Sequence, residues 1–179
     1  MTPEEKFMFD LDGYLVVRGV LSQEEIDGLN ALADTAWPGE YDERGLRRTS
    51  RVSQWGPATQ RLMDHPHIVP YLTELLGPYV RVDHDYSIFM RKGGSAGRLH
   101  GGQTMQGGVP GDHWYKYHDG LMRNGLTVLT YCLSHAGPGD GGFGCIPGSH
   151  KSNFTTQIPD EVRTHQRSAH YVRQVEVEA

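Results

Sequence analysis

The sequence predicts an α+β protein whose main body is a β-sandwich or barrel. Helical periodicity with helix-capping residues is confined to the part of the chain before Gly77, and alternating strand patterns follow it. Glycine accounts for 23 of 179 residues, nearly twice its usual share of about 7%. Such a share is typical of a chain with many turns and close backbone approaches.

The chain is predicted to begin with a strand and a helix. Residues 13–20, GYLVVRGV, form a short apolar run between turn residues, as in a strand. Ser22 and Glu25 have the spacing of a capping box, which predicts an amphipathic helix over 22–36. Its apolar face is formed by Ile26, Leu29, Leu32 and Ala33.

An irregular segment and a second helix come next. Residues 37–60 are polar and contain several prolines and glycines, which predicts irregular backbone. Residues 66–76 are predicted to be helical, with Pro70 in the first turns and Gly77 as the C-terminal stop. Both predicted helices therefore precede the strand-rich part of the chain.

Strand patterns dominate after the second helix. Residues 79–90 begin by alternating valine with charged residues, 125–136 are apolar and β-branched, and 142–147 form a short strand between turns. Residues 170–179 alternate again. We therefore expect this part of the chain to form antiparallel strands in two facing sheets, with the helices packed outside.

Composition excludes several classes of protein. The formal net charge of −5 provides no basic footprint for nucleic acid. No stretch approaches the roughly 20 apolar residues of a membrane-spanning helix, and the N-terminus lacks the basic and apolar regions of a signal peptide. We therefore expect Cys132 and Cys145 to be buried thiols in a reducing compartment, and the protein to be cytoplasmic.

Ten histidines raise the question of a metal site. A mononuclear iron oxygenase needs two imidazoles and one carboxylate on one face. On a strand the natural pair is His-x-Asp or His-x-Glu, because side chains at i and i+2 point the same way. The chain contains no such pair. His100, in the glycine-rich run RLHGGQTMQGG, has Gly102 at i+2, and one histidine alone makes no site.

The other histidines are explained by ordinary structural roles. His65 and His67 are expected to be capping and surface residues at a helix start, and His84 to be solvated or paired between two aspartates. His150, after the Pro-Gly turn of IPGSHK, is at least as well explained by backbone hydrogen bonds that hold this turn. Motifs for a nucleophilic serine and for a phosphate-binding loop are incomplete in this sequence.

In their order and spacing, several segments together resemble the phytanoyl-CoA dioxygenase family. Residues 9–34, FDLDGYLVVRGVLSQEEIDGLNALAD, and the later HPHIVPYLTELLG resemble the N-terminal half of that family. Residues 124–154, which include a Pro-Gly-Ser-His-Lys turn, resemble its central strand pair and the turn of the same sequence. The resemblance implies a double-stranded β-helix, or jelly roll, that holds one Fe(II). It also implies that 2-oxoglutarate and O₂ are used to oxidise a C–H bond of a small organic substrate.

The resemblance also implies roles for single positions. His100 falls on the first iron ligand, and Tyr131 falls where the family often places an aromatic residue near 2-oxoglutarate. The carboxylate ligand falls on Gly102, which has no side chain. The family's distal histidine and its arginine for 2-oxoglutarate would fall beyond Ala179.

These positions lead to an expectation about the domain. We expect residues 1–179 to be a single, incomplete oxygenase-like domain. Residues 1–77 would be its helical N-terminal part, and 78–179 the first part of a jelly roll whose final core strands are missing. Such a chain is expected to be inactive in this form.

Three functions stay open. The first is an Fe(II)/2-oxoglutarate oxygenase acting on a small molecule. The second is a C–H halogenase in which a halide occupies the iron position left open at Gly102. The third is a non-enzymatic small-molecule-binding module that kept the fold and lost the metal. Asp112, His113 or Asp119 of the long loop could supply a substitute ligand.

Overall fold

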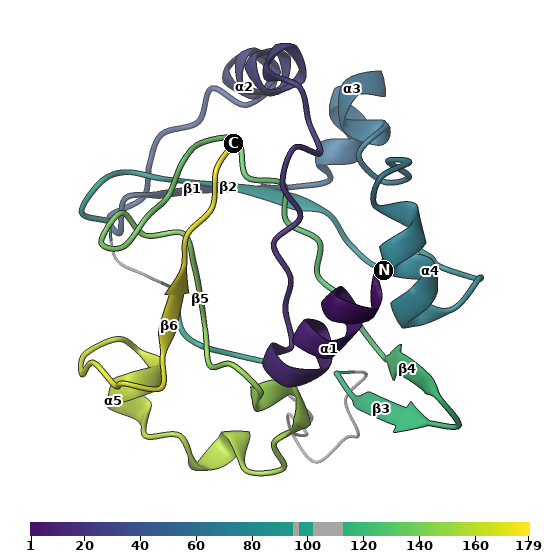
Figure 1. The fold of residues 1–179 in the computed structure, drawn as a ribbon. Coiled ribbons are helices and arrows are strands. Elements are labelled where there is room, and N and C mark those ends of the chain that lie inside the picture. The colour runs from purple at the N-terminus through teal and green to yellow at the C-terminus, as the bar shows by residue number, and fades with distance from the viewer. Residues whose placement is uncertain (95–96, 102–112) are drawn as a thin grey trace.

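The computed structural model describes residues 1–94, 97–101 and 113–179 (Figure 1). The helices are α1 (Pro3–Asp12), α2 (Gln23–Ala36), α3 (Pro57–Gln60), α4 (Val69–Leu76) and α5 (Asp160–Arg163). The strands are β1 (Leu46–Ser50), β2 (Tyr86–Met90), β3 (Tyr115–His118), β4 (Leu121–Asn124), β5 (Phe143–Cys145) and β6 (Arg173–Val175). Short 3₁₀ helices are η1 (Val52–Trp55), η2 (Ser149–Lys151) and η3 (Thr155–Gln157).

Within these ranges the strands form three two-stranded sheets, β1–β2, β3–β4 and β5–β6. Each pair is antiparallel, as predicted. The mixture of helices and strands confirms the α+β class. The two facing sheets of the prediction are not seen in the described part of the chain, where the sheets stay separate (Figure 1).

The N-terminal helices both begin with a capping box. In α2, Ser22 is the N-cap and exchanges hydrogen bonds with Glu25, which confirms the predicted helix start. In α1, Thr2 and Glu5 form the same motif, with Pro3 at the first helical position. Helix α1 was not predicted, although its Thr-x-x-Glu spacing carried the same signal.

Two of the predicted strands are absent from the structure, and a third is shorter than predicted. Residues 13–20 connect α1 to α2 without strand pairing, and 79–85 are unpaired so that β2 starts only at Tyr86. Residues 125–135 are neither helix nor strand, and only Ala136 forms an isolated bridge, with Val177. The apolar pattern reports how well side chains fit a pleated surface, whereas a strand also needs a partner for its backbone.

The segment between the two predicted helices is more regular than expected. Residues 37–60 were predicted to be irregular, but they contain β1, η1 and α3. Strand β1 is stabilised by a partner strand from a distant part of the chain, because Leu46 pairs with Met90 and Ser50 with Tyr86. Helix α4 begins at Val69 rather than at residue 66, after a turn, and ends at Gly77 as predicted.

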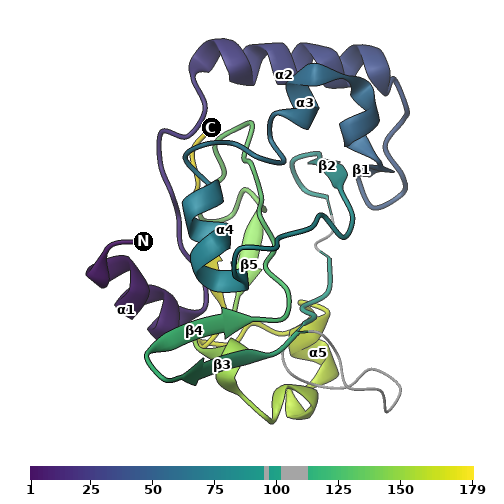
Figure 2. The same cartoon turned by 90° about the vertical axis from the view of Figure 1, so that its right-hand side faces the viewer.

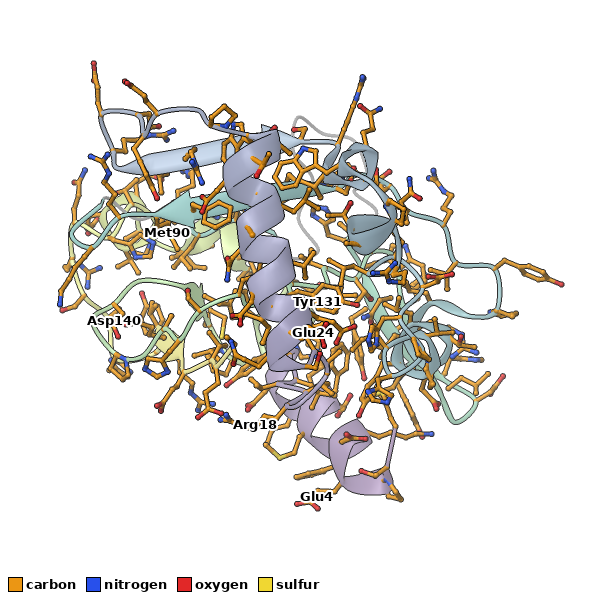
Figure 3. The ribbon with its side chains drawn as sticks, turned by 90° about the horizontal axis from the view of Figure 1, so that it is seen from above. Glu4, Arg18, Glu24, Met90, Tyr131 and Asp140 are labelled. Atoms are coloured by element: carbon orange, nitrogen blue, oxygen red, sulfur yellow. The ribbon has the colours of Figure 1, made fainter. Side chains whose placement is uncertain are left out.

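A small core connects α1, α4 and β4. Phe9 of α1, Leu75 of α4 and Met122 of β4 are buried against one another. Figure 2 shows α1 and α4 lying next to the β3–β4 hairpin, and Figure 3 shows α2 lying across the top of the molecule. The longest described helix, α2, has 14 residues, and none of the described helices has the length and apolar character of a membrane span.

Arg47 of β1 lies in an aromatic cage. Its guanidinium carbon is 4.7 Å from the centroid of the Trp37 ring and 5.0 Å from that of Phe89. The side chain is only 11% exposed, and its nearest carboxylate oxygen, on Asp34, is 3.6 Å away. The planar cation is therefore stabilised mainly by ring faces that join the end of α2 to the β1–β2 sheet.

We expect Arg47→Lys to lower the free energy of unfolding by about 1 kcal/mol, because a lysine ammonium cannot stack on ring faces as a planar guanidinium does. Urea denaturation of the variant and the parent protein measures the difference. Arg18→Lys is the matched control, since Arg18 is exposed beside Glu178. Equal stability of the two variants would contradict the role of the cage.

Candidate metal centre

His100 lies in the short segment 98–100, which contacts α5 through a hydrogen bond and an ion pair. The backbone N–H of Leu99 donates a hydrogen bond of 2.8 Å to the carbonyl oxygen of Arg163. The guanidinium of Arg98 lies 3.3 Å from the carboxylate of Asp160. His100 itself is exposed. Contacts with α5 therefore position the segment, and no strand pairing contributes within the described residues.

The residues that the structure describes do not fit a complete iron site. Among them, no three His, Cys, Asp or Glu side chains come together as metal ligands. Gly102 lies outside the described residues, and a glycine offers no side chain as a ligand. A 2-His-1-carboxylate site needs three protein ligands on one face. The assignment of His100 as the first iron ligand stays a prediction.

The substitute ligands considered for this site are spread over the β3–β4 region. Asp119 lies at the turn between the two strands, and its carboxylate is 3.0 Å from the Nδ1 atom of His118. Both side chains are more than 80% exposed. His113 is exposed just before β3, and Asp112 lies outside the described residues. Their contribution to a metal site stays a prediction.

Tyr131 connects the segment after β4 to the turn that follows α3 through a hydrogen bond and a ring contact. Its hydroxyl donates a hydrogen bond of 2.8 Å to the carbonyl oxygen of Leu62, and its ring meets His65 edge-on at 6.3 Å between centroids. Burial raises the pKa of Tyr131 to about 12, so the hydroxyl stays protonated and remains a donor. Its role beside 2-oxoglutarate stays a prediction, and this structure uses the hydroxyl for a backbone contact.

We expect Tyr131→Phe to lower the free energy of unfolding by about 1 kcal/mol, because a half-buried hydrogen bond is lost and the Leu62 carbonyl loses this donor. Thermal denaturation checks this value against Tyr79→Phe, a change at a side chain that is 97% exposed. A Tyr131→Phe protein as stable as the control would show that the hydroxyl has no structural role.

The Pro-Gly-Ser-His-Lys turn docks onto the C-terminal end of α1. The backbone N–H of Gly148 donates a hydrogen bond of 2.8 Å to the carbonyl oxygen of Asp12. The His150 ring lies 6.1 Å from that of Phe9 and 4.8 Å from that of Tyr115. Burial lowers the pKa of His150, which favours a neutral imidazole. The backbone hydrogen bonds expected to hold this turn through His150 stay a prediction, and the contacts described for its ring are with Phe9 and Tyr115.

Sequence reasoning missed the polar contacts that accompany this docking. Asp10 of α1 accepts a hydrogen bond from the Tyr115 hydroxyl, and its second carboxylate oxygen lies 3.3 Å from the Lys151 ammonium. The Tyr115 hydrogen bond is the main reason why the pKa of Asp10 lies below its usual range. These contacts have no local signal in the sequence, because Tyr115 and Lys151 are 105 and 141 residues away from Asp10.

Of the other predicted histidine roles, the paired surface role of His84 agrees with the structure. The capping role predicted for His65 and His67 is not seen, because Ile68 is the N-cap of α4 and has no side-chain cap hydrogen bond. His84 Nδ1 lies 2.8 Å from a carboxylate oxygen of Asp83, at the surface. His65 and His67 meet edge-on at 5.3 Å in the turn before α4. Both cysteines are free and half-buried, and burial raises the pKa of both thiols. None of these groups adds a ligand to a three-residue metal site in the described part of the chain.

The fold is similar to solved structures of HygX from Streptomyces hygroscopicus. With nickel, 2-oxoglutarate and hygromycin B bound, that protein matches at 22% identity and a TM-score of 0.77. With nickel and 2-oxoglutarate the values are 21% and 0.78. Each match covers 100% of this chain and 75% of the HygX chain. At 19% identity, the iron-bound HygX structure has a TM-score of 0.72. At these identities the likeness shows the fold.

The family assignment comes from the sequence as a whole. Comparison with curated proteins finds no match. The model of the family described as Phytanoyl-CoA dioxygenase (PhyH), whose members depend on Fe(II) and 2-oxoglutarate, matches residues 9–179. That range includes all three segments that carry the resemblance and almost the whole chain. The protein therefore belongs to the phytanoyl-CoA dioxygenase family.

Proposed function

We propose that this protein is an Fe(II)/2-oxoglutarate oxygenase-like protein whose substrate is a small organic molecule, with His100 as its first iron ligand. The match of the family model over residues 9–179 carries this proposal. The fold that the chain shares with HygX, which was crystallised with a metal, 2-oxoglutarate and hygromycin B, supports it. When bound, Fe(II) would supply O₂ activation, and 2-oxoglutarate would supply the reducing electrons.

The chain's own residues limit this activity. Gly102 removes the carboxylate of the His-x-Asp pair, so the metal would lose one anionic ligand and gain an open position. A halide in that position would favour C–H halogenation, which keeps the halogenase as the second candidate function. The third candidate, a small-molecule-binding module, is favoured by the missing three-residue metal cluster among the described residues.

Metal titration of three variants tests the proposal. Ni(II), a stand-in for Fe(II) that air does not oxidise, is titrated with and without 2-oxoglutarate by isothermal calorimetry. We expect weak binding by the parent protein and an affinity on the order of tenfold higher for Gly102→Asp, since even outer-shell partners change metal affinity by 10- to 100-fold. The gain should vanish in Gly102→Asp/His100→Ala.

The control variant is Gly102→Asp/His84→Ala, which removes a surface histidine paired with Asp83. It should keep the gain. A gain that survives the loss of His100 would refute His100 as the ligand. No response to 2-oxoglutarate in any variant would favour the binding module, and tighter Ni(II) binding by the parent protein when chloride is added would favour the halogenase.

A further inference from the structure

The β1–β2 sheet has one covered face and one open face. Trp37, at the end of α2, contacts Arg47 and Phe89 and covers the first of them. Side chains directly opposite each other in an antiparallel pair lie on the same face. The register therefore assigns to the open face Leu46, Arg48, Ser50, Tyr86, Ile88 and Met90. Figure 1 shows α2 on one side of this sheet and β5 and β6 on the other.

The open face is apolar where a solvated sheet face is ordinarily polar. Strand β2 presents on it Tyr86, Ile88 and Met90, which are 38%, 45% and 44% exposed. The turn 137–142 limits the face at its Met90 end, because a Cβ atom on Gly141 would lie 3.9 Å from the Cε atom of Met90. A row of exposed apolar side chains that ends at a wall indicates a binding surface.

The turn at this end of the open face is held in place by β6. The Gln174 side chain donates a hydrogen bond of 2.8 Å to the Gly137 carbonyl oxygen and accepts one of 2.9 Å from the Gly139 N–H. The Asp140 carboxylate accepts the N–H of Gly137 within the same turn. Figure 3 shows Asp140 on the same side of the molecule as Met90. The Met90 end of the face is therefore a fixed apolar end, with a negative charge beside it.

The other end of the open face carries the positive charge of Arg48. Its guanidinium carbon lies 4.6 Å from the centroid of the Tyr86 ring, so the cation is directed away from the apolar end. The arginines at positions 44 and 47 lie beside aspartates, and the nearby Asp83 lies 2.8 Å from His84. Arg48 has no acidic partner among the residues that the structure describes. Its fork of N–H donors matches a carboxylate.

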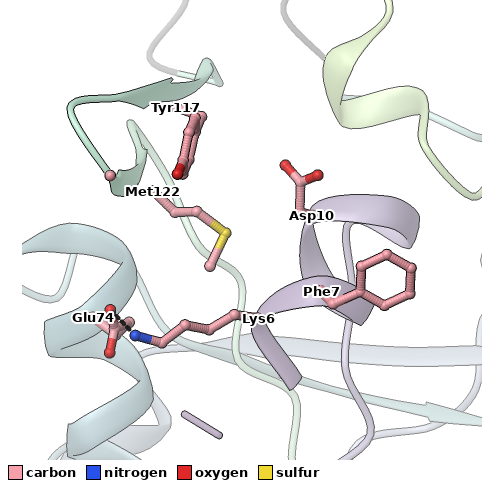
Figure 4. Close-up of a pocket in the computed structure, with 7 residues that line it drawn as sticks. Lys6, Phe7, Asp10, Glu74, Tyr117 and Met122 are labelled. Carbon is pink, nitrogen blue, oxygen red and sulfur yellow. Dashed lines mark hydrogen bonds and ion pairs between the residues drawn. The ribbon is translucent and has the colours of Figure 1, made fainter. Parts of the chain in front are cut away.

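The charges around the hollow between α1, α4 and the β3–β4 hairpin are compensated, in contrast to Arg48 (Figure 4). The Lys6 ammonium lies 2.8 Å from a carboxylate oxygen of Glu74, and the Asp10 carboxylate lies 3.3 Å from the Lys151 ammonium. Such pairs leave no single charge for an ionic ligand. The open face of the β1–β2 sheet is therefore the better site for a charged molecule.

We propose that the open face binds a small organic carboxylate with an aromatic or aliphatic body. The carboxylate accepts hydrogen bonds from the Arg48 guanidinium, and the body lies over Ile88 and Met90 against the turn 137–142. An ammonium ion of similar shape is repelled by Arg48, and a neutral alcohol loses the charged contact. The inference is independent of the iron chemistry proposed above, since no residue of the open face is a predicted metal ligand.

NMR titration of the ¹⁵N-labelled protein without added metal tests this with three probes of similar shape: 3-phenylpropionate, 3-phenylpropanol and 3-phenylpropylammonium. We expect 3-phenylpropionate to bind about fivefold more tightly than the alcohol, the scale of one partly exposed charge pair, and the ammonium ion to bind most weakly. The shifted amide signals should belong to β1, β2 and the turn 137–142. Added salt should reduce the preference for the carboxylate. 2-Oxoglutarate, which has no apolar body, should bind there more weakly than 3-phenylpropionate.

Two variants locate the site. Arg48→Gln removes the cation and should erase the preference for the carboxylate. Ile88→Thr keeps a β-branched side chain on the strand and should weaken all three probes while the preference stays. The matched control is Arg18→Gln, which removes an exposed cation beside Glu178 and should alter neither.

Three results would overturn the proposal: equal binding of the three probes, unchanged affinities in the folded Arg48→Gln and Ile88→Thr proteins, or binding of 2-oxoglutarate as tight as that of 3-phenylpropionate. Self-association is the fourth. A sedimentation coefficient that rises with concentration in the parent protein but not in Ile88→Thr, without binding of the probes, would assign the open face to a second copy of the chain.

Discussion

No succinate should form when the 179-residue protein is incubated with Fe(II), 2-oxoglutarate and ascorbate under air. Turnover requires a metal held with open positions and a cosubstrate clamped in a reactive orientation. Of the family's His-x-Asp pair this sequence provides only His100, because Gly102 at the carboxylate position has no side chain. One imidazole does not hold Fe(II) against water. We therefore expect succinate at the level of the protein-free control.

The assay compares the parent protein with His100→Ala and Gly102→Asp. Succinate is quantified by chromatography, so that uncoupled loss of 2-oxoglutarate is not counted. Succinate from the parent protein that disappears in His100→Ala would contradict the expectation. It would show that His113, Asp119 or another group supplies the missing ligands. Gly102→Asp tests whether the carboxylate alone limits turnover.

Gly13→Ala should produce a large loss of stability for the addition of a single methyl group. Gly13 ends α1 with φ +83°, in the left-handed region, and a Cβ there would lie 2.7 Å from the Cγ atom of His150. The left-handed backbone costs about 1–2 kcal/mol for alanine, and forcing a methyl group into an occupied site costs typically 1–3 kcal/mol more. We expect the free energy of unfolding to fall by about 3 kcal/mol.

Gly19→Ala separates these two costs. Gly19 has φ +65°, but a Cβ there meets no atom within 4 Å, so only the backbone cost should appear. Chemical denaturation of both variants measures the difference. In Gly13→Ala/His150→Ala the clash is removed, so this protein should be more stable than the sum of the two single changes predicts by about 1 kcal/mol or more. Equal losses in Gly13→Ala and Gly19→Ala would show that His150 does not pack on α1.

The sequence alone determined those features that depend on neighbours a few residues apart. Ser22 and Glu25 set the start of α2, and Gly77 sets the end of α4, because caps and stops act through local backbone hydrogen bonds. The order and spacing of several segments, of which 9–34 and 124–154 are the most specific, indicated the family that the model over 9–179 shows. The missing carboxylate ligand at Gly102 could also be recognised from the sequence, because the identity of a residue does not depend on the fold.

The tertiary structure decided where distant segments meet. Strand β1 forms in a stretch predicted to be irregular because β2 provides its hydrogen-bond partners, and residues 125–135 have strand-like side chains without such partners. The position of the Pro-Gly-Ser-His-Lys turn against α1 depends on Gly13 leaving room for the His150 ring. Periodicity describes one segment at a time, whereas pairing and docking are properties of two segments, and so only the folded chain determines them.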